Sequence, residues 1–411
     1  MNSFKKILLS IFLVLMFNFK LIDSKIIIAD QIESTDIIEN HRKRDIFNYG
    51  KFVWSLPIKY YIEKPVLSSN VYKAIQHIQN NTCVTFHRQG SFFNNTPGLI
   101  FKKASFCSSY VGLMFLRNSQ EIYLSKGCYK NVALILHEIG HALGLVHEHS
   151  RIDRDKYIKI NKNAIQPDAD VNFEILSSLE YVNYSTTYDA ASLMHYKLYD
   201  YAINKSVQTI SSKIHKAYEK MMGQRMKMTF NDYKQINLKY CNKCNWVDNN
   251  GKRNIVNYAG LRCTNGGYPH YNDCQKCVCP TGYGGINCEF IVSSNKKCGK
   301  TSFKATKLQK KLFFNKKMTC YIHIKARKQM KIKIKILKTK SPYKKICTED
   351  ISIQIKHFVD KGNTGLLLCG QHKKTIDIIS SSNSVLIIYR GRFINNHLSL
   401  SFKEINLYKK I

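Results

Sequence analysis

Three histidines, His137, His141 and His147, are the residues of this chain most clearly spaced for chemistry. They stand in the run HEIGHALGLVH at residues 137–147. On a helix, His137 and His141 lie one turn apart on the same face, where two imidazoles can chelate one tetrahedral Zn²⁺. Glu138 lies beside them, where a carboxylate can take a proton from a zinc-bound water and pass it to a leaving group. The spacing predicts one zinc ion, with Glu138 as a general base.

The third histidine requires a change of chain direction. His147 comes six residues after His141 and would point away from the metal if the helix continued. Gly144 lies between them, and glycine readily adopts the left-handed conformation that ends a helix. The H-E-x-x-H pattern alone recurs by chance, but adding Gly144 and His147 at this spacing makes a chance match rare.

The elements around this run mix helices with strands. A helix is predicted from Asn131 to Leu143, with Asn131 as its N-cap and an apolar stretch that buries it beneath the site. A second helix is predicted from Ser69 to Gln79. Strands are predicted at Phe52 to Ile62 and at Gln120 to Leu124.

The extended motif resembles that of the astacins, metzincins whose zinc helix is followed by a Met-turn. The zinc run continues as EHSRIDRD at residues 148–155, and the expected turn is present as SLMHY at 192–196. Further matches are YD at 188–189, GQR at 223–225 and the closing stretch 237–241. The resemblance spans residues 45–241. It implies an α+β, two-lobed metzincin catalytic domain with zinc in the central cleft.

The same resemblance implies roles for three more residues. Met194 would form the apolar floor beneath the zinc ligands, although an ordinary core methionine would have nearly the same physics. Tyr196 would be an additional zinc ligand that swings off the metal and donates a hydrogen bond to the oxyanion. Without the family, Tyr196 would be interpreted as a buried aromatic. Glu148 would bind the new N-terminal ammonium after propeptide removal; the alternative is a surface acid.

The N-terminus has the features of a secretory precursor. Residues 1–6 carry two lysines and residues 7–19 are almost wholly apolar, which indicates a signal peptide, residues 1–24, that is cleaved near Ser24. No other apolar run is long enough to cross a bilayer. Residues 25–44 are predicted to be a short propeptide that ends in the basic triplet Arg42-Lys43-Arg44, so the mature chain would begin at Asp45. The F-x-G-D motif common in astacin propeptides is absent from residues 25–44.

The 14 cysteines are an even number and, in a secreted chain, are expected to form seven disulfides. The C-x-x-C spacings at 241–244 and 274–277 would also suit a zinc ribbon, but the oxidising compartment favours disulfides. Passage through the secretory pathway would also allow N-glycosylation, and four sequons are present, at Asn80, Asn94, Asn183 and Asn204.

Two further domains are expected after residue 241. Residues 242–289 are rich in Gly, Asn and Cys and cannot build a core without disulfides; the runs CTNGGY and CVCPTGYGG resemble an EGF-like module. Residues 298–409 alternate polar and apolar side chains, as in KIKIKI at 331–336, which predicts a β-sandwich. Paired cysteines and this alternation resemble a CUB domain.

Disulfide pairs follow from these resemblances and from spacing. The equal spacing of the last four cysteines suggests two local bridges, Cys298 with Cys320 and Cys347 with Cys369. The astacin and EGF-like patterns imply the other five: Cys83 with Cys241, Cys107 with Cys128, Cys244 with Cys274, Cys263 with Cys277, and Cys279 with Cys288.

The net charge of +36 allows two interpretations. A polyanion partner outside the cell would be a glycosaminoglycan or another anionic matrix rather than nucleic acid. Alternatively, Lys, Ile and Asn are enriched together because all three have A/T-rich codons, and the charge lies on solvated faces. Residues 299–346 contain no Asp or Glu, so a basic face would lie in the CUB-like domain.

Together these features predict a secreted, extracellular zinc metalloendopeptidase that hydrolyses peptide bonds of matrix or other secreted proteins. The competing hypothesis is a binding glycoprotein, in which the EGF-like and CUB-like domains act and the protease fold is a silent scaffold. A missing zinc ligand or base would indicate that second case. Neither is missing.

Overall fold

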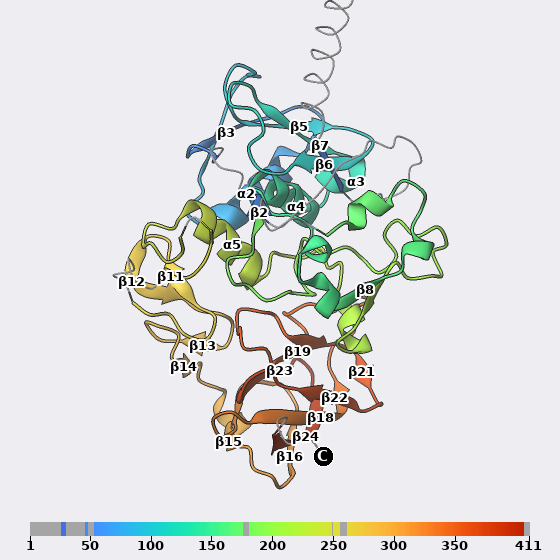
Figure 1. Ribbon diagram of the computed structural model, residues 1–411, viewed down its shortest axis with the longest axis vertical. Helices are drawn as coiled ribbons and strands as arrows, with labels where there is room; N and C mark the ends of the chain where they lie inside the picture. The colour runs from blue at the N-terminus through green and yellow to red at the C-terminus, as the bar shows by residue number, and fades with distance from the viewer. Residues whose placement is uncertain are drawn as a thin grey trace, which may run out of the picture.

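The computed structural model describes residues 53–175, 181–248, 250–254 and 261–406, together with the backbone of residues 26–29 and 46–47. The expected signal peptide, the basic triplet at 42–44 and Asp45 lie outside these residues. Figure 1 shows three parts: a large α+β part at the top, a small disulfide-rich part at its side, and a β-rich C-terminal part below. No helix among the described residues is long and apolar enough to span a membrane.

One mixed sheet forms the upper half of the first part, with strand order β1-β6-β7-β5-β3-β4. Strands β3, β4, β5 and β7 are parallel, whereas β6 runs antiparallel to β7, and β1 pairs with the free side of β6. Helix α2 packs against α4, and their apolar faces share a core with the sheet. The bounds are β1 Ile26–Ala29, β3 Ile58–Ile62, α2 Ser68–Gln79, β4 Phe86–Arg88, β5 Leu99–Lys103, β6 Cys107–Tyr110, β7 Gln120–Leu124, α3 Lys126–Tyr129 and α4 Val132–Ala142.

The predicted elements of this half agree with the structure except at one strand. The second predicted helix and the strand at 120–124 are found at the expected places. The strand predicted from Phe52 is shorter, since β3 begins at Ile58. Proline has no N–H to donate to a strand ladder, so Pro57 marks the point before which pairing stops.

The lower half of the first part contains little regular structure. Short 3₁₀ helices and two small antiparallel pairs, β8 with β10 and β2 with β9, alternate with loops. Helix α5 begins with a capping box formed by Thr229 and Asp232. The bounds are β2 Ile46–Phe47, η1 Glu148–Ser150, η2 Arg154–Lys156, β8 Ile158–Ile160, η3 Lys162–Ala164, η4 Asp170–Phe173, β9 Tyr181–Val182, β10 Ile210–Ser212, η5 Lys216–Lys220 and α5 Phe230–Tyr240.

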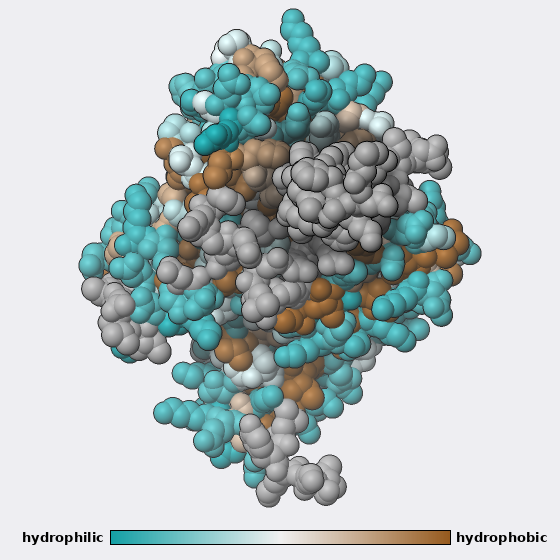
Figure 2. Space-filling model, turned by 45° about the horizontal axis from the view of Figure 1, so that its top comes forward, coloured by the Kyte–Doolittle hydropathy of each residue, from teal (hydrophilic) through white to brown (hydrophobic). Residues whose placement is uncertain are grey.

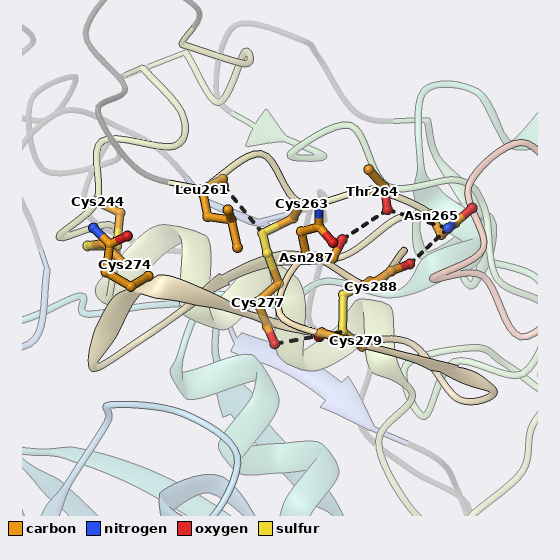
Figure 3. The surroundings of a disulfide bond; sticks show 12 residues. Cys244, Leu261, Cys263, Thr264, Asn265, Cys274, Cys277, Cys279, Asn287 and Cys288 are labelled. Carbon is orange, nitrogen blue, oxygen red and sulfur yellow. Dashed lines mark hydrogen bonds between the residues drawn. A yellow bond between two sulfur atoms is a disulfide. The ribbon is translucent and has the colours of Figure 1, made fainter. Parts of the chain in front are cut away.

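The disulfide-rich part consists of two short hairpins joined by bridges. Figure 3 shows the three disulfides of this part: two lie near Thr264 and Asn265, and the third, between Cys244 and Cys274, lies on the other side of the view. Thr264 Oγ1 donates to Asn287 O at 2.9 Å, and Asn265 Nδ2 donates to Cys288 O at 2.9 Å. The bounds are β11 Tyr268–His270, β12 Asp273–Val278, β13 Tyr283–Gly284 and β14 Phe290–Ile291.

The C-terminal part is a β-sandwich. One sheet has the order β15-β17-β23-β19-β20, and the other has β16-β24-β18-β21 with β22 also paired to β18. Ile332, Ile334 and Ile336 of β18 are buried in the core, as the alternation predicts. The bounds are η6 Lys296–Cys298, β15 Ser302–Lys304, β16 Lys310–Asn315, β17 Met318–Lys325, β18 Lys331–Lys340, β19 Ile353–Lys356, β20 Leu366–Leu368, β21 Gln371–His372, β22 Ile376–Ile379, β23 Ser384–Gly391 and β24 His397–Ile405.

All 14 cysteines are paired. The seven pairs coincide with those expected from the sequence: 83–241, 107–128, 244–274, 263–277, 279–288, 298–320 and 347–369. The bridge between Cys83 and Cys241 joins the end of α5 to the segment after α2. It therefore links the two halves of the first part covalently, across 158 residues of sequence. The described surface on the face seen in Figure 2 is covered mostly by hydrophilic side chains.

Candidate active site

Helix α4 carries the first two predicted zinc ligands. Asn131 is its N-cap, because its side chain accepts a hydrogen bond from Ala133 N at 2.9 Å. Nearly every side chain of the helix is buried, including His137, Glu138 and His141, none of which is exposed to solvent. The helix therefore holds these three polar side chains away from the outer surface.

The helix ends in a Schellman motif built on Gly144. Gly144 N donates to His141 O at 2.7 Å, and Leu145 N donates to Gly140 O at 2.8 Å. Gly144 has a φ of 99°, in the left-handed half of backbone space where glycine is favoured. The turn redirects the chain so that His147 returns to the helix, as the spacing predicts.

Backbone carbonyls orient two of the histidine rings. His137 Nδ1 lies 2.9 Å from Leu193 O, and His141 Nδ1 lies 2.7 Å from Leu145 O. A carbonyl oxygen can only accept, so both Nδ1 atoms carry the hydrogen and both Nε2 atoms keep a lone pair. This arrangement of outer partners is typical of metal-binding histidines.

The three Nε2 atoms converge on one point. His141 Nε2 lies 3.1 Å from His137 Nε2 and 3.2 Å from His147 Nε2. Two nitrogens bound to tetrahedral zinc lie about 3.3 Å apart, given Zn–N bonds of about 2.0–2.1 Å. Lone pairs facing each other at this distance repel unless a cation lies between them, so the donor set fits zinc. Across the described ranges, this is the one cluster of His, Cys, Asp or Glu side chains able to hold a metal ion.

The Met-turn lies directly beneath the helix. A Cβ placed on Gly140 would lie 3.1 Å from Met194 Sδ, so the methionine is in close contact with α4. Asp232, at the start of α5, holds the turn: its carboxylate accepts Ser192 Oγ at 2.6 Å and Leu193 N at 3.1 Å. Leu193 O also accepts from His137, a predicted zinc ligand, so Asp232 supports the candidate metal site through Leu193.

Tyr196 lies against His147, the third predicted ligand. Its ring centroid is 4.3 Å from that of His147 and 3.9 Å from that of His149, and its side chain is fully buried. His149 Nε2 lies 2.9 Å from Asn172 O, which fixes the His149 ring. Tyr196 is thus packed between aromatic rings on the wall of the site.

Comparison with known proteins identifies this architecture. The family model described as astacin, a peptidase family, matches residues 47–241. This region is an astacin domain. The matched range begins two residues after the expected mature N-terminus and ends at the predicted boundary.

The similarity to curated relatives covers more of the chain than the astacin domain alone. Zinc metalloproteinase nas-34 of Caenorhabditis elegans is 31% identical over 355 residues, which are 85% of this chain and 55% of the relative. Zinc metalloproteinase nas-27 of the same organism is 28% identical over 359 residues, 82% of this chain and 80% of the relative. The chain thus spans about half of the first relative and most of the second. High choriolytic enzyme 1, a hatching enzyme zinc-protease of Oryzias latipes, is 27% identical with a TM-score of 0.41 and covers 46% of this chain and 94% of its own.

Within the astacin domain, Glu148 follows the third ligand directly. Its backbone N donates to Met194 O at 3.0 Å. Its Oε1 accepts from Asp189 N at 2.6 Å and lies 3.7 Å from Arg151 Nε. Glu148 is 4% exposed, so the alternative of a surface acid is wrong. Its predicted bond to the N-terminal ammonium stays a prediction, since Asp45 lies outside the described residues.

The astacin domain also contains supporting residues to which sequence reasoning assigned no role. Arg151 is fully buried and binds Asp153 through two nitrogens at 2.9 and 3.0 Å, and Thr186 O at 2.9 Å. Asp189 forms hydrogen bonds through its backbone N and through its carboxylate. Both lie in matched motif segments, and a buried charge within a motif is the signal that could have singled them out.

The four predicted glycosylation sites differ in accessibility. Asn80, Asn94 and Asn204 are exposed, whereas Asn183 is half-buried and its Oδ1 accepts from Ser185 N at 2.9 Å. Glycan attachment at these positions stays a prediction, and Asn183 is the least accessible of them.

Proposed function

We propose that the mature chain is a secreted zinc metalloendopeptidase that hydrolyses peptide bonds of extracellular proteins. The observation that carries the proposal is the convergence of three imidazole Nε2 atoms beside the buried Glu138. The astacin domain and the relatives named zinc metalloproteinases support it. The seven disulfides support an oxidising, extracellular destination.

Each side chain has a proposed task. His137, His141 and His147 would hold zinc, which when bound polarises the scissile carbonyl and lowers the pKa of water towards 7. Glu138 takes the proton from the attacking water and delivers it to the leaving amine. The Tyr196 hydroxyl donates a hydrogen bond to the oxyanion that develops on the carbonyl.

The precursor is proposed to be latent until residues 25–44 are removed. In support, β1 comes from this segment and pairs along β6, with Ile26 opposite Tyr110 and Ala29 opposite Cys107. Two residues after β6, Gly112 N donates to His141 O at 2.8 Å, so this sheet edge adjoins the zinc helix. After cleavage, the ammonium of Asp45 would bind Glu148.

The downstream parts are proposed to be an EGF-like module at residues 242–289 and a CUB-like domain at 298–409. The three disulfides of the first and the two five-stranded sheets of the second support these assignments.

The outer sheet of the sandwich favours an additional role, binding of an anionic matrix. Lys333 of β18 stands directly opposite Lys403 of β24. Ser401 of β24 lies between two lysines, Lys335 of β18 on one side and Lys311 of β16 on the other. Like charges directly opposite each other destabilise a sheet unless a counter-charge is near. Lys333, Lys335, Ser401 and Lys403 also line a hollow of about 90 Å³. Asp377 of β22 supplies one counter-charge here, because its Oδ1 lies 3.9 Å from Lys333 Nζ. A sulfated glycan would supply further negative charge for the remaining lysines.

Binding to such a matrix is testable on immobilised heparin. Changing Lys331, Lys333 and Lys335 to Ser is expected to weaken heparin binding about tenfold, at about 0.5 kcal/mol for each charge removed. Retention of the unchanged protein should fall steeply with salt. A matched control replaces the exposed Lys64, Lys130 and Lys162, which removes the same charge from the astacin domain. If both triple variants were retained equally, heparin binding would depend on the net charge of the protein and not on the lysines of β18.

The peptidase proposal is tested by mass spectrometry. Residues 45–411 would be expressed and incubated with a peptide library, in parallel with a chain that begins at residue 25. We expect cleavage at interior bonds by the shorter chain, loss of cleavage with a zinc chelator, and much slower cleavage by the longer chain. Absence of cleavage, or removal of terminal residues alone, would reject an endopeptidase.

A further inference from the structure

The C-terminal β-sandwich is joined to the astacin domain by a buried interface. Figure 1 shows the sandwich directly below the lower half of the first part, with β19 and β23 towards it. One apolar core runs through both, since Tyr188 and Met221 of the astacin domain belong to the same cluster as Ile355 and Leu367 of the sandwich. The two parts therefore behave as one packed unit rather than as domains that move independently on a linker.

The loop between β19 and β20 makes the polar contacts of this interface that lie nearest the Met-turn segment. Thr364 donates to Asp189 Oδ2 twice, from its backbone N at 3.0 Å and from its Oγ1 at 2.8 Å. Asn363 Nδ2 donates to Tyr188 O at 2.6 Å. Asp360 Oδ2 accepts from Thr187 N at 3.1 Å. These four hydrogen bonds thus bind three successive residues, 187–189, just before the Met-turn.

Asp189 connects this interface to the zinc site through further hydrogen bonds. Its Oδ1 accepts from Ala191 N at 3.0 Å, and its backbone O accepts from Ser192 N at 2.9 Å. The same turn then presents Leu193 O to His137 Nδ1 at 2.9 Å. On the other side, Asp189 N donates to Glu148 Oε1 at 2.6 Å. A shift of Asp189 would therefore move both the carbonyl that orients a zinc ligand and the residue that follows the third ligand.

Hydrogen bonds from β19 hold the sandwich side of the contact in place. Gln354 Nε2 donates to Thr364 O at 2.8 Å, and Lys356 Nζ donates to Asn363 O at 2.8 Å. Both donors belong to β19, which is paired on both sides, with β23 and with β20. Asp189, Asn363 and Thr364 are at most 2% exposed, so water cannot replace these bonds if they are lost.

We propose that Thr364 and Asn363 are positioning residues for the zinc site, acting from the C-terminal sandwich through Asp189 and the Met-turn. The sandwich would then contribute to catalysis in addition to binding an anionic matrix. This inference rests on the proposed peptidase function. Burial raises the pKa of Asp189 to about 7, and the hydrogen bonds from Thr364 and Ala191 oppose that rise, so the loop also favours the ionised carboxylate.

The test uses the full mature chain with three substitutions. Thr364→Val keeps the shape of the side chain and removes the Oγ1 donor, whereas Thr364→Ser keeps the donor. Thr339→Val is the matched control: Thr339 is also a fully buried threonine of the sandwich, and its Oγ1 has no hydrogen-bond partner among the described residues. Thr339→Val therefore makes the same change of side chain without removing a hydrogen bond, and a thermal unfolding curve of each variant shows how much stability each has lost.

Two measurements decide the outcome. For Thr364→Val we expect kcat to fall about tenfold with KM within about twofold, while Thr364→Ser and Thr339→Val stay near the unchanged protein. Hydrogen exchange of the peptide spanning residues 190–194 should quicken in Thr364→Val alone. Unchanged kcat and exchange in Thr364→Val, or equal loss in all three variants, would overturn the inference. If the unchanged protein were inactive, the proposed peptidase function would fail, and the exchange measurement would still decide the coupling.

Discussion

Replacing Glu138 by Gln is expected to lower kcat for peptide hydrolysis by about 10²- to 10⁴-fold, the usual contribution of a positioned general base. Glutamine has nearly the same shape and keeps the packing of this fully buried position on α4. It cannot take the proton of the attacking water, so the chemical step slows. The zinc content should not change, because the proposed ligands include the three imidazoles and not Glu138. Steady-state kinetics and metal analysis of the same preparation measure both quantities.

Glu121→Gln serves as the control for that substitution. Glu121 lies half-buried on β7, outside the zinc site, so its replacement should leave kcat within about twofold. Equal activity of Glu138→Gln and the unchanged protein would contradict the role of Glu138. Loss of zinc from Glu138→Gln would instead assign that carboxylate to the metal.

Replacing Gly144 by Val is expected to weaken zinc binding about 10- to 100-fold. The φ of Gly144 is 99°, and a β-branched residue held there costs about 1–3 kcal/mol. The chain can relieve this strain by abandoning the Schellman turn, which displaces His147 from the other two ligands. Peptide hydrolysis should fall in parallel. Competition with a chromophoric chelator measures the zinc affinity.

Gly299→Val separates local strain from the loss of a ligand. Gly299 has a φ of 61°, also left-handed, and nothing lies within 4 Å of the Cβ that would be added. This variant carries comparable backbone strain in the sandwich, so it should lose stability without losing zinc. If Gly299→Val and Gly144→Val reduced zinc affinity equally, the proposal that the Schellman turn at Gly144 positions His147 would be wrong.

The parts of the site that local rules govern follow from the sequence. The 3.6-residue period places His137 and His141 on one helical face, and Gly144 is the residue that allows the chain to return with His147. The two-residue period of β18 likewise predicts which isoleucines are buried. In each case the residues that determine the geometry lie within a few positions of one another.

The parts that depend on distant contacts do not follow from it. The contact between Asp189 and Thr364 joins residues 175 positions apart, and no period or motif in either segment signals it. Asp232 could be expected from its capping box, but its bonds to the Met-turn could not. The resemblance to astacins assigned Glu148 to an N-terminal ammonium, whereas its contacts with Asp189 and Arg151 required the packed structure.

The most direct test of the zinc site is a titration of the metal-free mature chain with Zn²⁺, followed by peptide hydrolysis. The three converging imidazoles predict that activity rises linearly with zinc and reaches a plateau at one equivalent per chain. His141→Ala removes the central ligand and should show no such rise at these concentrations. Hydrolysis by the metal-free chain, or a plateau at a different stoichiometry, would contradict a single catalytic zinc held by His137, His141 and His147.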